Sequence, residues 1–177
     1  LDERCCFGSA ADASKCSRAS NLLAHAMRRA LDKADLAHPT RDPAVIAWLV
    51  ERQQAAVESG CTSDEAARRF LALHFMSIYI DDGTGASIDD LLFDVDGRPV
   101  MRDGVQLRRA QLHFETVIGV LESLGHASSA DKEQPPSSKV ESLGLEISLE
   151  EGIMRILGLR REAYAAKVDK LVESVCV

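Results

Sequence analysis

The stretch that decides the fold is HFMSIYIDDGTGAS, residues 74–87. Its first seven residues are rich in β-branched and aromatic side chains, which predicts a strand over 74–80. Two adjacent aspartates, Asp81 and Asp82, follow the strand directly, and glycines come next. Because burying a carboxylate is costly, this pattern indicates either a site for a metal ion or a plain turn at the surface.

Helices are predicted on the N-terminal side of this stretch. A helical pattern runs from Asp12 to Leu31, and Asp42 followed by Pro43 predicts the N-cap and first residue of a second helix. A capping-box signature predicts a short third helix from Thr62. The apolar face predicted for the first helix consists of Leu22, Leu23, Ala26, Met27 and Ala30.

A hairpin, a helix and a strand are predicted after residue 90. The segment LLFDVDGRPVMRDG, residues 91–104, predicts a small hairpin with Asp96-Gly97 as its turn. Apolar residues at helical spacing over 110–124 predict an amphipathic helix, and the alternation in VESLGLEISLE, residues 140–150, predicts one strand. This mixed order predicts an α+β fold with antiparallel strands, and a last amphipathic helix ends the chain.

Composition sets limits on the class of protein. The chain has 177 residues, of which 46% are hydrophobic and 28% charged, values typical of a globular domain. The five cysteines include no CxxC pair, which favours free intracellular thiols over zinc knuckles or disulfides. No membrane span or secretory signal is visible, so we expect an intracellular protein, cytoplasmic or nuclear, with no membrane partner. The formal charge of −7 gives no global attraction for nucleic acid, which usually binds a basic surface.

Adjacent carboxylates at the tip of a tight hairpin can face one cleft. Such hard oxygen ligands suit Mg²⁺ (or Mn²⁺), and ions held in this way serve phosphoryl transfer. The alternative is an ordinary Asp-Asp-Gly turn. Read as part of an EF-hand loop, DVDG, residues 94–97, puts Leu92 at the first loop position and Asp103 at the last, in place of the expected Asp and Glu. The histidines form no HxxxH pair, so we interpret them as surface or core residues, with His113 facing solvent.

Four segments resemble reverse transcriptases, in that family's order and across most of the chain. YIDD, residues 79–82, resembles the YxDD box, and FGSAADASKCSR, residues 7–18, resembles the palm segment that precedes it. LESLG, residues 121–125, followed by Lys132 and KVESLGLEIS, resembles the run of helix, glycine, lysine and Leu-Gly hairpin at the palm–thumb junction. GIMRIL, residues 152–157, fits the start of the thumb. Within that family, the segments most resemble the reverse transcriptases of retrotransposons.

This resemblance implies a partial polymerase palm over 1–150, with an inserted helical segment at about 35–69, and a palm–thumb junction with the start of the thumb over 151–177. Asp81 would be the main metal ligand, Asp82 the second carboxylate, and Lys132 a catalytic residue near the triphosphate. The residues implied to contact primer or nucleotide are Phe7, Gly8, Tyr79, Ile80, Leu143 and Gly144. The implied partners are a primed RNA or DNA template, deoxynucleoside triphosphates (dNTPs) and the N-terminal fingers and palm of a parent polyprotein.

One departure from the family limits what this chain is expected to do. The family has a further metal-binding aspartate on a palm strand upstream of the Phe-Gly segment, but only six residues precede Phe7. We therefore expect a fragment that is inactive alone. Two alternatives remain open: a non-catalytic, degenerate retroelement-derived domain or binding module, and an unrelated α+β domain with a chance Asp-Asp turn.

Overall fold

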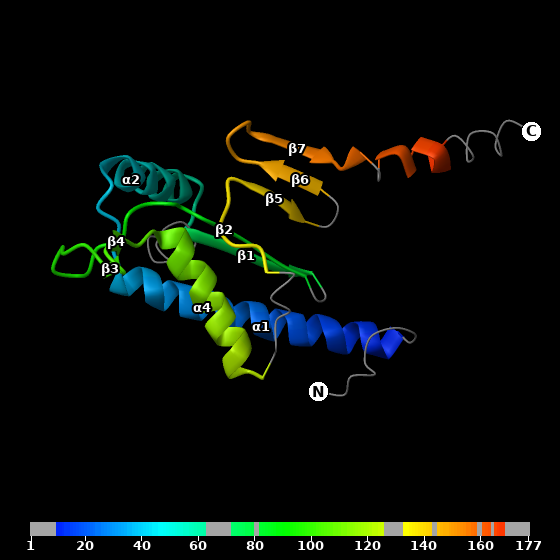
Figure 1. Ribbon diagram of the computed structural model, residues 1–177, viewed down its shortest axis with the longest axis horizontal. Coiled ribbons are helices and arrows are strands. Elements are labelled where there is room, and N and C mark those ends of the chain that lie inside the picture. Colours follow the sequence, from blue (N-terminus) through cyan, green and yellow to red (C-terminus); the bar gives the residue numbers. More distant parts are fainter. Residues whose placement is uncertain are drawn as a thin grey trace, which may run out of the picture. The chain divides into compact units, whose positions relative to one another are not determined.

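A computed structural model of the chain describes residues 10–62, 72–79, 82–125, 133–142, 145–158, 161–163 and 165–168. The chain is mixed α+β and divides into two compact units, residues 1–133 and 134–177. Each unit is described by itself (Figure 1). The predicted boundary after residue 150 falls inside the second unit. No helix among the described residues is both long enough and apolar enough to cross a bilayer.

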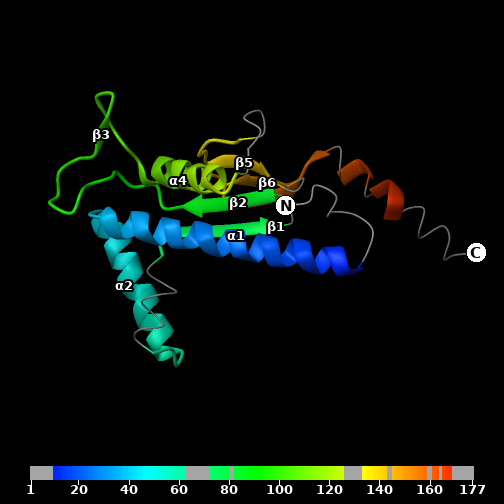
Figure 2. The same ribbon diagram turned by 90° about the horizontal axis from the view of Figure 1, so that it is seen from below.

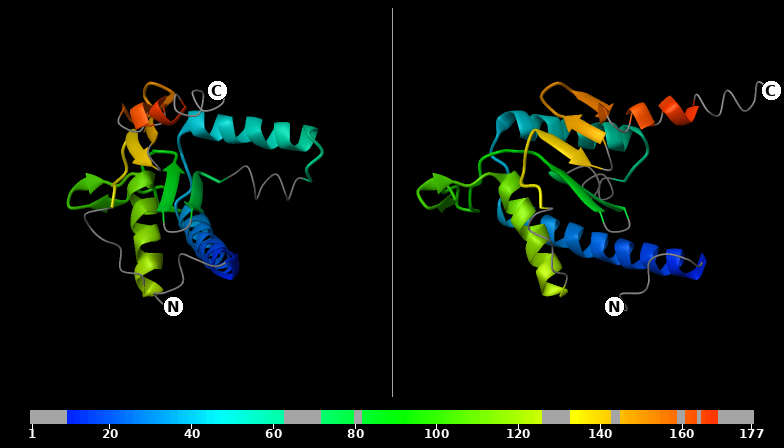
Figure 3. Two further views of the ribbon diagram at one scale, coloured as in Figure 1. Left: turned by 90° about the vertical axis from the view of Figure 1, so that its right-hand side faces the viewer. Right: turned by 45° about the vertical axis from the view of Figure 1, so that its right-hand side comes forward.

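The first unit is built on a β-hairpin with two helices against it. Its elements in chain order are α1 (Ala10–Ala37), α2 (Pro43–Glu58), β1 (His74–Tyr79), β2 (Asp82–Ser87), β3 (Met101–Arg102), β4 (Val105–Gln106) and α4 (Arg109–Ser123). Helix α1 runs alongside the hairpin of β1 and β2, and α4 packs on α1 and on β2 (Figure 2). Figure 3 shows α1 nearly end-on in its left panel, with α4 beside it on the same side of the hairpin.

The apolar core of this unit lies between α1, α4 and β1. Met27, Leu31 and Met76 are buried there, and five partly buried side chains surround them: Leu23, Ile78, Val117, Val120 and Leu121. The buried face of α1 therefore differs from the predicted one, because Leu22 is 71% exposed. Ala24, Met27 and Leu31 follow the i, i+3, i+7 spacing of one helix face, whereas Leu22 lies outside that stripe.

The glycines after the aspartates belong to a strand. Residues 82–87 pair with residues 74–79 in antiparallel register, with Met76 opposite Gly85 and Ile78 opposite Gly83. A Cβ atom at Gly83 would lie 3.3 Å from the Met76 Cε atom, and one at Gly85 would lie 3.4 Å from its Sδ atom. The two glycines therefore leave room for the buried Met76 side chain, which gives a packing reason for a glycine-rich strand.

The predicted turn at Asp96-Gly97 is confirmed. The Gly97 amide donates to the Asp94 carbonyl at 3.0 Å, and the Arg98 amide donates to the Asp94 carboxylate at 2.8 Å. A second turn follows between β3 and β4, where Asp103 and Gly104 both have positive φ. Two positive φ angles in a two-residue loop are the pattern of a type I′ turn, which matches the twist of paired strands.

Helices α2 and α4 begin and end close to their predicted positions. The Asp42 carboxylate accepts from the Ala44 amide at 2.8 Å, so it caps α2 with Pro43 at the first helical position. Figure 2 shows α2 projecting away from α1 and the hairpin. Gly125, with φ of +75°, follows the C-cap of α4 as predicted. The helix predicted from Thr62 lies outside the described residues.

The second unit contains a three-stranded antiparallel sheet, β5 (Lys139–Ser142), β6 (Leu145–Ser148) and β7 (Ile153–Ile156). The single strand predicted from alternation over 140–150 is wrong, because the residues form two strands, β5 and β6, that pair antiparallel with Ser142 opposite Leu145. The predicted turn before IMRIL is confirmed, with Ser148 opposite Ile153 and Gly152 at φ +64°. Helical backbone follows at residues 161–163 and 165–168.

Candidate functional site

The predicted YIDD site is only partly described. Tyr79 and Asp82 are register partners at the end of the β1–β2 ladder, so Ile80 and Asp81 form the link between the strands. The structure describes the backbone of Tyr79 and Asp82, and it places neither Ile80 nor Asp81. The other predicted residues that lie outside the described part of the chain are Phe7, Gly8, Lys132, Leu143 and Gly144.

A buried polar cluster that the sequence did not predict lies at the opposite end of the same hairpin. Asp35, near the end of α1, places one carboxylate oxygen 3.0 Å from Nδ1 of His74 and the other 2.8 Å from Nε2 of His113. His74 begins β1 and His113 lies in α4, so three elements meet at one carboxylate. The prediction that His113 faces solvent is wrong: it is 5% exposed, because it lies on the face of α4 that packs on α1.

Arg109 is the cation of this cluster. Its side chain is fully buried and donates to both oxygens of Asp90, at 2.5 and 3.1 Å, and to one oxygen of Asp35 at 2.7 Å. A guanidinium that bonds a carboxylate through two parallel N–H groups is fixed in position as well as in charge. Arg109 and His113 are one helical turn apart, so α4 presents both to the carboxylate on α1.

Each histidine also meets an oxygen on its other ring nitrogen. Nδ1 of His113 lies 2.8 Å from the Ser87 hydroxyl, and Nε2 of His74 lies 3.6 Å from the exposed Asp32 carboxylate. The two rings meet edge to face with centroids 5.4 Å apart. His74 and Ser87 are register partners, so the first rung of the β1–β2 ladder brings both sides of the cluster together.

The charges of the cluster stabilise one another. Burial alone would raise the pKa of Asp35, but hydrogen bonds from His113 and His74 outweigh it and hold that pKa far below its usual range. Burial alone would lower the pKa of Arg109, whereas Asp90 and then Asp35 raise it. Asp35 and Arg109 are thus both charged over the ordinary pH range. Within the described residues, no buried side-chain nitrogen or oxygen lacks a hydrogen-bond partner.

Two kinds of chemistry fit this geometry. As a hydrogen-bonded network, the cluster fastens α1, β1, β2 and α4 together. As a ligand set, Asp35, His74 and His113 offer one oxygen and two nitrogens that lie within 4.8 Å of one another. The three residues are far apart in the sequence, so no local motif predicts that they form a cluster. The one available signal was the spacing of Arg109 and His113, which lie at i, i+4 and therefore share one face of an amphipathic helix.

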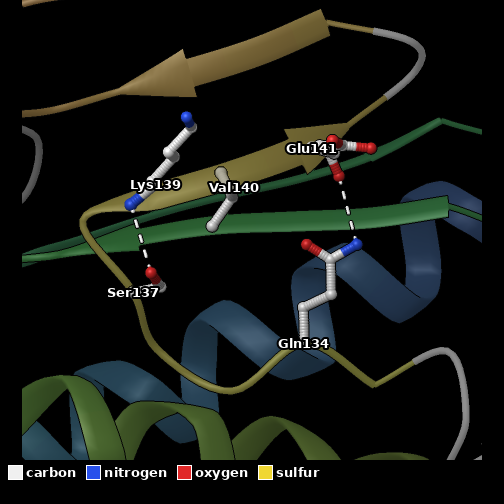
Figure 4. Close-up of a pocket in the computed structure, with 5 residues that line it drawn as sticks. All are labelled: Gln134, Ser137, Lys139, Val140 and Glu141. Carbon is white, nitrogen blue, oxygen red and sulfur yellow. Dashed lines mark hydrogen bonds between the residues drawn. The ribbon is translucent and has the colours of Figure 1, made fainter.

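The second unit has a shallow, open depression between the segment before β5 and the strand itself (Figure 4). There the Gln134 side chain donates to the Glu141 carbonyl at 3.2 Å, and the Lys139 amide donates to the Ser137 hydroxyl at 3.2 Å. Lys139 also pairs with Glu146 at 3.1 Å, and the hydrogen bond from Lys139, joined by one from Arg155, lowers the pKa of Glu146. These groups pair with one another, and the depression offers no converging set of free polar groups among the described residues.

Comparisons with models of protein families, with curated proteins and with solved structures found no match to this chain.

Proposed function

We propose that this chain is the C-terminal part of a reverse-transcriptase palm, followed by the start of the thumb. The parent would be an RNA-directed DNA polymerase that extends a primer with dNTPs. The observation that supports the proposal best is the register of β1 with β2: Tyr79 and Asp82, the first and last residues of YIDD, oppose each other at the last rung of the antiparallel ladder. The pairing of β5 with β6 in the second unit adds support, because Ser142 opposes Leu145, the residues that flank Leu143-Gly144 in the sequence.

The donor chemistry of the hairpin end fits the metal that this function implies. Asp81 and Asp82 supply adjacent carboxylates, the hard oxygen ligands that Mg²⁺ and Mn²⁺ prefer. A divalent ion held there would neutralise charge on a triphosphate and activate a primer hydroxyl. The chain's own part is to supply these two carboxylates next to the last rung of a ladder whose strands contact α1 and α4.

Metal binding by the whole chain is the direct test. We expect the wild-type chain to bind Mn²⁺ weakly, and we expect both Asp81→Asn and Asp82→Asn to weaken that binding further. Electron paramagnetic resonance of free Mn²⁺ measures the bound fraction. Asp103→Asn is a matched control, because Asp103 is an exposed aspartate in another two-residue hairpin turn and asparagine tolerates its positive φ. Equal binding by all four proteins would contradict a metal site at YIDD.

Polymerase activity is tested in a longer polypeptide that joins this chain to its upstream palm strand and fingers. There we expect Asp81→Asn to reduce primer extension by roughly 10³-fold with folding intact, because a catalytic metal contributes several kcal/mol to the transition state. Extension at the wild-type rate would rule out the proposed function. Nucleic-acid binding without extension, unchanged by Asp81→Asn, would support the alternative of a non-catalytic, retroelement-derived binding module.

A further inference from the structure

The cluster at the base of the hairpin holds more carboxylates than guanidinium groups. It holds two carboxylates, Asp35 and Asp90, and one guanidinium, Arg109. Arg109 gives two of its hydrogen bonds to Asp90 and one to Asp35, so its charge is matched chiefly by Asp90. The Asp35 carboxylate is left between two imidazoles. A buried carboxylate in excess needs a further cation or proton nearby.

Both ring nitrogens of His113 face an oxygen at hydrogen-bond distance. The Ser87 hydroxyl donates to the Ile88 carbonyl at 2.9 Å, and its oxygen lies 2.8 Å from Nδ1 of His113, where it can accept the proton of the Nδ1–H tautomer. In that tautomer Nε2 presents a lone pair to the Asp35 oxygen 2.8 Å away, which is the form of an imidazole that binds a metal ion. Two lone pairs at this distance repel unless a proton or a metal ion lies between them.

We infer that Asp35, His74 and His113 form a binding site for a transition-metal ion of the zinc class. The ligand atoms would be a carboxylate oxygen of Asp35 and the ring nitrogens that face this carboxylate, Nδ1 of His74 and Nε2 of His113. Two imidazole nitrogens and one carboxylate oxygen favour Zn²⁺ over Mg²⁺, and they leave a fourth position for water. The ligands come from α1, β1 and α4, so the ion would join the three elements that enclose the core of the first unit.

The surroundings of the two imidazoles match those of metal-bound histidines. Such a ring usually donates its second N–H to an oxygen that fixes its tautomer and orientation. Ser87 is in that position for His113, and Asp32 lies near the second nitrogen of His74. The site is separate from YIDD, because His74 with Ser87 is the first rung of the ladder and Tyr79 with Asp82 the last. The inference therefore does not depend on the proposed function.

The experiment uses the whole chain without an affinity tag, with Co²⁺ and Zn²⁺ as the probes. We expect one ion per chain and the visible d–d absorption of four-coordinate Co²⁺. The X-ray absorption spectrum of the zinc-loaded chain should show nitrogen and oxygen ligands only. His74→Gln and His113→Gln should each abolish stoichiometric binding. Ser87→Ala should weaken it about 10-fold, because it removes only the orienting partner.

Two control variants separate this site from other sources of metal binding. His25→Gln changes an exposed histidine on α1 and should bind zinc like the wild type. Asp81→Asn should also leave zinc binding unchanged, so a failed polymerase assay and a failed zinc assay remain distinguishable. Circular dichroism reports whether each variant is folded. If the histidine variants are unfolded, the X-ray absorption spectrum of the wild-type chain tests the proposed ligands instead. Three results would each overturn the inference. They are sulfur ligands in that spectrum, a lack of stoichiometric binding by the wild type, and full binding by folded His113→Gln.

Discussion

Arg109 is a buried cation with two carboxylate partners, and its removal leaves both of them uncompensated. We expect Arg109→Met to lower the free energy of unfolding by about 3–5 kcal/mol, measured by urea unfolding at neutral pH. The adjacent Arg108 offers a matched control, because it pairs with Asp89 at 2.6 Å while both side chains are about half exposed. Arg108→Met should cost at most about 1 kcal/mol. Equal losses in the two variants would contradict the role given to burial.

Asp35 makes a pH-dependent contribution to stability. Its pKa is held far below the usual range in the folded chain, so the unfolded chain takes up the proton first as the pH falls. The contribution is complete above the unfolded-state pKa of about 3.9 and is lost progressively below it. We expect Asp35→Asn to be less stable at neutral pH and to show a shallower loss of stability in acid. Urea unfolding at several acidic pH values measures both slopes, and parallel slopes would contradict the prediction.

Single residues were predictable from the sequence only where their partners are close in the chain. Asp42 caps the helix that begins next to it, and Asp94 bonds to the amide of Arg98 four residues later. Asp35, in contrast, meets His113 across 78 positions, and only folding brings them together. His113 was therefore interpreted as a surface residue, although its neighbour one turn earlier, Arg109, is fully buried.

At the scale of single elements, the turn between β3 and β4 gives the sharpest prediction. Gly104 has φ of +80° with open space around it, so only the backbone conformation resists a side chain there. We expect Gly104→Ala to destabilise the chain by about 1–2 kcal/mol. Gly119 also has open space, but it lies inside α4, so Gly119→Ala should stabilise by up to about 1 kcal/mol. Thermal unfolding of the two variants should shift in opposite directions.

Element types were predicted well where periodicity and turn residues agree. The helix over 109–123 has both an apolar stripe and a closing glycine, and it was predicted nearly to its ends. The glycine-rich β2 has no strand-like composition, and its pairing depends on the space that Met76 needs. At 139–148 the alternation is real, but it continues across a chain reversal, so one strand was predicted where two exist. Alternation reports which side chains share a face and does not report where a ladder folds back.

At the scale of the whole molecule, the two units differ in how much they bury. The first unit encloses Met27, Leu31, Leu92 and Met76, whereas among the described residues of the second unit only Ser148 is buried. All four residues of β7 are exposed. We expect amide hydrogens of β5, β6 and β7 to exchange about tenfold or more faster than those of β1 and α4, because local opening costs less where little apolar surface is buried. Hydrogen exchange with mass spectrometry measures this, and equal protection in both units would contradict it.

The six-rung ladder between β1 and β2 also sets the distance between its two ends. Five steps of about 3.4 Å separate its first and last rungs, so the backbones of His74 and Tyr79 lie roughly 17 Å apart. That is about twice the distance over which salt screens charge in the cell. Occupancy at one end should therefore leave affinity at the other unchanged, and a pair of paramagnetic ions would report this spacing directly as a spin–spin distance.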